Sequence, residues 1–164
     1  MMDPSVRKLV WESLLDADFH ARYFGSLAEL QAKRERSITW SITVLSSGAV
    51  ATFFRKGLSD LAPALSLVVV FLSASLNVLK FGKAATTSAS LQRQWSAILS
   101  DLEALWTQIE SGTIEPAEAL KQRQKIDARH ASLDEIASSR LSTSKRLVRQ
   151  CWETMLQSRH VAPA

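Results

Sequence analysis

Two long apolar runs lie in the first half of the chain, separated by a short polar connection. Ile38 to Phe54 comprises 17 residues and Leu61 to Leu79 comprises 19, and neither run contains a formal charge. At 1.5 Å per helical residue they cover about 26 to 28 Å, close to the ~30 Å hydrocarbon layer of a bilayer. The pattern favours a transmembrane helical hairpin over residues 38–79. A pair of buried core helices in a soluble bundle is the alternative.

The segment before the hairpin, residues 1–37, has the pattern of one amphipathic helix. Asp3, Pro4 and Ser5 supply a start signal, and Gly25 is the only weak point. Apolar residues recur three or four positions apart at Val6, Val10, Leu14, Ala17, Ala21, Phe24 and Ala28. We therefore predict a helix over 5–36 that packs one face on a partner helix and continues into the first apolar run.

Residues 80–164 carry two further helical patterns. The first has a heptad seam at Leu91, Trp95, Ile98, Leu102, Leu105 and Ile109. Ser111 and Gly112 end it, and Pro116 starts a returning helix that we predict over about 117–158. The seam of the returning helix, with a stutter near Leu141, comprises Ile126, His130, Leu133, Ala137, Leu141, Ser144, Val148, Cys151 and Met155. The short turn predicts an antiparallel pair.

The predicted fold is all-α, a transmembrane hairpin continuous with a long cytoplasmic antiparallel bundle or coiled coil. With only 5 Gly and 4 Pro, composition agrees with helices. The net charge of +4 is interspersed along the chain, so no nucleic-acid partner is expected. The single cysteine, Cys151, fits a reducing compartment, and the charged first 37 residues do not resemble a signal peptide.

Basic residues next to the apolar runs indicate an orientation. Five flank the outer ends of the hairpin and two lie in the connection between the runs: Lys33, Arg34, Arg36, Lys80 and Lys83, against Arg55 and Lys56. Because positive charge is enriched on the cytoplasmic side, we expect a multi-pass protein of the inner membrane with both termini in the cytoplasm.

Polar side chains within the two runs are the candidates for lining a pore. They are Thr39, Thr43, Ser46, Ser47, Ser66, Ser73 and Asn77. Hydroxyls can instead bond to the backbone of their own helix, and Asn77 can bond between helices, so ordinary packing is the alternative for each.

Nothing in the sequence points to an enzyme, a cofactor or a metal. His20, His130 and His160 are far apart in the sequence, and there is no phosphate-binding loop or nucleophile motif. Three tryptophans of the helical region, Trp95, Trp106 and Trp152, are candidates for a cytoplasmic ligand pocket or for packing in the seams.

The layout resembles the SLATT family of prokaryotic two-span membrane proteins from conflict and defence systems. The resemblance rests on the N-terminal helix with Ala21-Arg22-Tyr23-Phe24, the hairpin, and the long helical region after Lys83. It implies a membrane effector that assembles into pores in antiviral defence, by abortive infection, when a partner sensor or a nucleotide second messenger triggers it. It carries no catalytic residue over to this chain.

Three functional hypotheses follow. The first is a homo-oligomeric inner-membrane effector that forms a pore or disrupts the membrane, because two spans cannot enclose an aqueous path alone. The second is a non-conducting membrane anchor or scaffold whose cytoplasmic coiled coil recruits a partner. The third is a soluble α-bundle that binds a partner helix or nucleic acid, with the apolar runs as its core.

Overall fold

The computed structural model describes residues 4–46, 70–71, 74, 81–138 and 144–159, and all the regular structure within them is helical. The helices are α1 (Pro4–Ser46), α4 (Phe81–Glu110), α5 (Pro116–Ser138) and α6 (Lys145–Ser158). The chain divides into two compact units, one of residues 1–27 and 88–164 and the other of residues 28–87. The all-α class is therefore confirmed.

The predicted transmembrane hairpin lies largely outside the described residues. Of the run 38–54 only 38–46 are described, and of the run 61–79 only 70, 71 and 74. Among the residues that are described, no helix contains a window long and apolar enough to cross a membrane. The helix predicted over 5–36 does continue into the first run, since α1 extends without interruption to Ser46.

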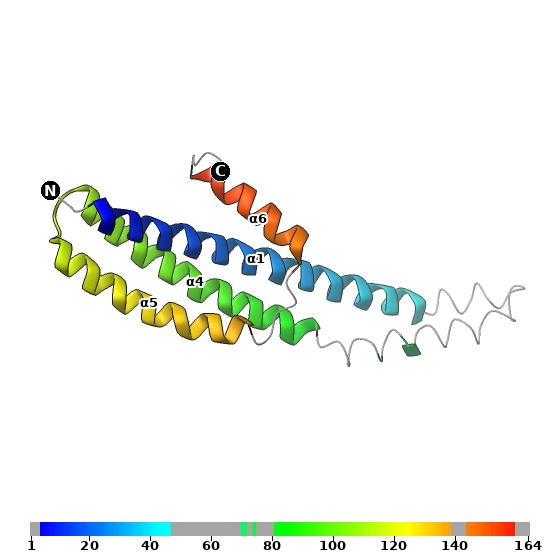
Figure 1. Ribbon diagram of the computed structural model, residues 1–164. Coiled ribbons are helices and arrows are strands. Elements are labelled where there is room, and N and C mark those ends of the chain that lie inside the picture. The colour runs from blue at the N-terminus through cyan, green and yellow to red at the C-terminus, as the bar shows by residue number, and fades with distance from the viewer. Residues whose placement is uncertain (1–3, 47–69, 72–73, 75–80, 139–143, 160–164) are drawn as a thin grey trace, which may run out of the picture. The chain divides into compact units, whose positions relative to one another are not determined.

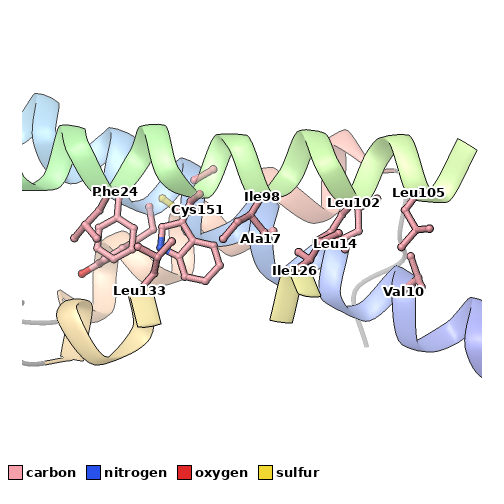
Figure 2. Packing of buried hydrophobic residues seen from close by; sticks show 14 of the residues in the cluster. Val10, Leu14, Ala17, Phe24, Ile98, Leu102, Leu105, Ile126, Leu133 and Cys151 are labelled. Carbon is pink, nitrogen blue, oxygen red and sulfur yellow. The ribbon is translucent and has the colours of Figure 1, made fainter. Parts of the chain in front are cut away.

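In the first unit, the N-terminal part of α1 lies beside α4 and α5, and α6 packs against α1 (Figure 1). The predicted seam of α4 is confirmed, because all six of its residues are buried. Six of the seven predicted stripe residues of α1 are buried as well, and Ala28 is half-buried. Figure 2 shows Leu105 of α4 pointing toward Val10 of α1 within this core.

The turn between α4 and α5 forms as the sequence indicates. Gly112 adopts a left-handed backbone with φ 68°, which glycine reaches without a Cβ clash. The Thr113 N–H donates to the Gln108 carbonyl at 3.1 Å and the Gly112 N–H to the Ile109 carbonyl at 3.2 Å, the two bonds of a Schellman motif. Pro116 then begins α5 where its missing N–H costs nothing.

The prediction of a single returning helix over 117–158 is wrong. α5 ends at Ser138, and α6 starts at Lys145 after Ser144, whose backbone is extended at φ −77° and ψ 107°. The stutter near Leu141 marked this place, because an irregular heptad moves the apolar seam away from its partner. The separate α6 turns its own apolar face, with Cys151 and Met155 buried, toward the body of the unit.

Candidate functional site

The described part of the predicted pore face lies on the last turns of α1. Thr39 and Thr43 are exposed, and Ser46 is the last residue of the helix. The Thr39 hydroxyl donates to the Glu35 carbonyl and the Thr43 hydroxyl to the Thr39 carbonyl, each at 2.9 Å. The other lining candidates, Ser47, Ser66, Ser73 and Asn77, lie outside the described residues.

Large apolar side chains are exposed on the second unit, which comprises residues 28–87. Trp40 is 64% exposed and Val44, one turn further along α1, is 52% exposed. Val70 and Phe71, on the other side of the 47–69 segment in the sequence, are also exposed. Trp and Val four positions apart share a helix face, so α1 presents an exposed apolar strip at these two residues.

The described basic residues that flank the apolar runs are exposed. Lys33 pairs with Glu29 at 2.8 Å, while Arg34, Arg36 and Lys83 face solvent. Arg55, Lys56 and Lys80 lie outside the described residues. An exposed pair such as Lys33 with Glu29 adds little stability, because solvent screens the attraction between the two charges.

The three candidate tryptophans do not form one pocket. Trp95 is fully buried, Trp106 packs on Trp11 with ring centroids 5.1 Å apart, and Trp152 contacts Phe19 edge to face at 5.7 Å. Each indole thus packs against different residues. These surroundings agree with packing in the helical seams and not with one shared ligand pocket.

Two histidines that are far apart in the sequence, His20 and His130, come together in the first unit. His20 stacks on the Trp95 face at 4.4 Å and His130 meets the Trp95 edge at 4.4 Å. The Asp16 carboxylate lies 2.8 Å from His130 Nε2 and 3.5 Å from His20 Nδ1. The cluster was not foreseen because it joins α1, α4 and α5. His160 lies outside the described residues.

No set of three or more His, Cys, Asp or Glu side chains in the described ranges is arranged to hold a metal ion. The Trp95 Nε1 is buried and makes no hydrogen bond to any described residue. Both histidine rings pack on the fully buried Trp95.

A buried ionic network fastens α6 to the rest of the first unit. Asp18 is only 3% exposed, and its carboxylate accepts hydrogen bonds from Arg22 Nε at 2.6 Å and Arg159 Nε at 2.8 Å. Arg159 also reaches Glu103 of α4 at 2.6 Å, and Arg22 reaches Ser158 at 2.9 Å. Burial raises the pKa of Asp18, but the two arginines outweigh it and hold that pKa below its ordinary value.

The sequence did not reveal this network. Arg22 and Asp18 are four residues apart and could be paired by helical spacing. Arg159, however, is 141 residues from Asp18 and follows the returning helix predicted over 117–158, so periodicity gave no reason to pair the two. A lone acidic residue on an otherwise apolar face was the available signal.

Comparison with protein-family models, with curated proteins and with solved structures finds no match to this chain.

Proposed function

We propose that this protein is a homo-oligomeric effector of the inner membrane that forms a pore or disrupts the bilayer when triggered. In this proposal residues 38–79 form the membrane hairpin, and both termini lie in the cytoplasm. The trigger is a partner sensor or a nucleotide second messenger, and the setting is antiviral defence by abortive infection. The resemblance of the sequence layout to the SLATT family supports that setting.

The observation that carries the proposal is the exposed apolar strip of α1 at Trp40 and Val44. Soluble monomers rarely leave large apolar side chains open side by side, and such patches mark contacts with lipid or with other chains. Trp40 stands near one end of an uncharged 17-residue run, where tryptophan commonly sits at the level of lipid headgroups. Exposed Phe71 and Val70 add apolar surface from the second run.

Several hairpins around an axis are needed for conduction. One hairpin has no interior, whereas a ring of copies can turn the face that carries Thr39, Thr43, Ser46 and Ser47 inward. On this arrangement the apolar strip of Trp40 and Val44 faces lipid or a neighbouring copy.

Dye leakage from liposomes tests the pore. The purified chain is titrated at rising protein-to-lipid ratio, with a variant that carries Thr43→Leu and Ser46→Leu and a control that carries Ser41→Leu. Ser41 has the same hydroxyl chemistry but lies roughly 160° from Thr43 around the helix. At the highest protein-to-lipid ratios, where concentration drives assembly in place of the trigger, we expect leakage from the wild type and the control and none from the double variant, with oligomer size unchanged. Unchanged leakage from the double variant rules out the lining assignment.

A non-conducting membrane anchor or scaffold is the second candidate, and one observation favours it. The hydroxyls of Thr39, Ser41 and Thr43 all donate to carbonyls one turn back in their own helix, which satisfies them without water or a neighbour. An anchor needs no polar lining. Absence of leakage from the wild type at every protein-to-lipid ratio, with the protein retained in carbonate-washed membranes, supports this candidate. Recovery in the carbonate supernatant contradicts both.

A further inference from the structure

Two open grooves follow one side of the α4 and α5 pair, and one of them joins positive charge to an apolar floor. This first groove, called the arginine groove below, has a volume of about 290 Å³. It is lined by Arg93, Gln94, Ala97, Ile98, Arg129, Ser132 and Leu133. All of these residues belong to the first unit, so the groove is formed within one compact body.

Small side chains create the hollow. Ala97 of α4 and Ser132 of α5 are both exposed at the groove, while the larger Ile98 and Leu133 are buried beside them at 1% and 5% exposure. Side chains this short leave room where a leucine would cover the seam. The floor is consequently apolar and its opening faces solvent.

The two arginines of the groove, Arg93 and Arg129, differ in their hydrogen bonds and ion pairs within the described residues. Arg129 donates to the Asp101 carboxylate at 2.6 Å. Arg93 makes one long bond, from its Nε to the Ala89 carbonyl at 3.4 Å, and forms no ion pair within the described residues. The guanidinium of Arg93 therefore retains most of its five donors for another acceptor.

The other polar side chains at the groove leave the charge uncompensated. The Gln94 amide nitrogen lies 3.4 Å from the Ser90 carbonyl, and the Ser132 hydroxyl donates to the Arg129 carbonyl at 2.8 Å. Asp101 belongs to the neighbouring groove, which is lined by Asp101, Ala104, Leu105, Gln108, Gln122, Lys125 and Ile126. With Arg129 matched by Asp101, the arginine groove keeps one net positive charge, from Arg93.

We propose that the arginine groove binds a small soluble anion in which a phosphate or carboxylate is joined to a flat or apolar body. The anionic group pairs with Arg93, where a guanidinium offers parallel N–H donors to two oxygens. The apolar body lies on Ile98 and Leu133 beside Ala97. The volume is at the lower end for ligand pockets, which limits the ligand to roughly a dozen non-hydrogen atoms. This site is independent of the proposed membrane function.

Phenyl phosphate is the probe, titrated against the full chain in non-ionic detergent and followed by ligand-observed NMR. We expect a Kd on the order of 1 mM, as ligand efficiency allows for a compound of this size. Inorganic phosphate and neutral phenol should each bind about tenfold more weakly, because each lacks one half of the recognised chemistry. Equal binding of inorganic phosphate, or of phenol, overturns the proposal.

Two variants locate the binding. Arg93→Gln should weaken phenyl phosphate about tenfold, whereas Arg146→Gln, which changes an exposed arginine of α6 outside the groove, should leave it unchanged. Ala97→Leu keeps both arginines but fills the hollow and should abolish binding. Ala104→Leu, seven residues along the same exposed face, is its control, and helicity by circular dichroism should be preserved throughout. Wild-type affinity in either Arg93→Gln or Ala97→Leu overturns the assignment.

Discussion

Two tryptophans in the two units of this chain meet opposite surroundings. Trp95 in the first unit is fully buried between His20 and His130, while Trp40 in the second unit is 64% exposed. The first unit buries most of its large apolar side chains between its own helices, although Leu9, Ile136 and Trp152 are 38%, 45% and 46% exposed. In the described part of the second unit, Trp40, Val44 and Phe71 are 64%, 52% and 72% exposed. The difference separates apolar residues that the first unit buries in its core from apolar residues that remain exposed on the second unit.

Truncating each tryptophan tests this comparison most strongly. Trp95→Ala removes a fully buried side chain and should lower the free energy of unfolding of the first unit by about 3 to 5 kcal/mol. Trp40→Ala should change it by less than about 0.5 kcal/mol, because an exposed side chain loses few contacts on truncation. Denaturant unfolding in detergent, followed by circular dichroism, measures both.

Membrane retention should show the reverse order. If Trp40 faces lipid or another copy, Trp40→Ala should weaken membrane retention or oligomer formation. Trp95→Ala, measured in mildly destabilising buffer, should leave both membrane retention and oligomer formation unchanged. If Trp95→Ala and Trp40→Ala lost similar amounts of unfolding free energy, the contrast between a buried and an exposed tryptophan would be contradicted.

The buried carboxylate of Asp18 provides a second test within the first unit. Asp18→Asn keeps the shape but removes the charge that accepts from Arg22 and Arg159, and should cost about 2 kcal/mol. The matched control is Asp101→Asn, which removes an exposed pair with Arg129 and should cost under about 1 kcal/mol. Equal effects on the urea midpoint would show that α6 does not depend on the network.

Acid should act on the same network. The folded-state pKa of Asp18 lies below its ordinary value of 3.8, so the carboxylate stabilises the fold above about pH 4, and this contribution is lost as pH falls through the lowered pKa. The difference in unfolding free energy between wild type and Asp18→Asn should therefore be constant at neutral pH and shrink below about pH 4. A difference that persists undiminished at pH 2 contradicts this linkage.

Helical seams and turns could be predicted from the sequence, whereas contacts between residues far apart in the chain could not. The seam from Leu91 to Ile109 and the turn at Gly112 were predictable because helical periodicity and a left-handed glycine are local properties. The break before α6 was missed, although the stutter near Leu141 lay close to it, because helix-forming residues such as Lys145 and Arg146 continue the pattern after Ser144. The contact of Arg159 with Asp18, and the arginine groove, depend on how α4, α5 and α6 pack, which periodicity does not specify.

The smallest expected effect concerns Gly25, the one weak point in the helical pattern of α1. A Cβ built on Gly25 would lie 2.8 Å from the amide nitrogen of Gln92, which is the flexible end of a long side chain on α4. Gln92 is exposed and can turn away at little cost, while alanine gains up to about 1 kcal/mol of helix propensity over glycine. Gly25→Ala should therefore leave the first unit equally stable or stabilise it by about 0.5 kcal/mol. Thermal unfolding measures the change. The double variant with Gln92→Ala should give the full propensity gain, and a loss of more than about 1 kcal/mol in both would mean that the backbones of α1 and α4 require the glycine.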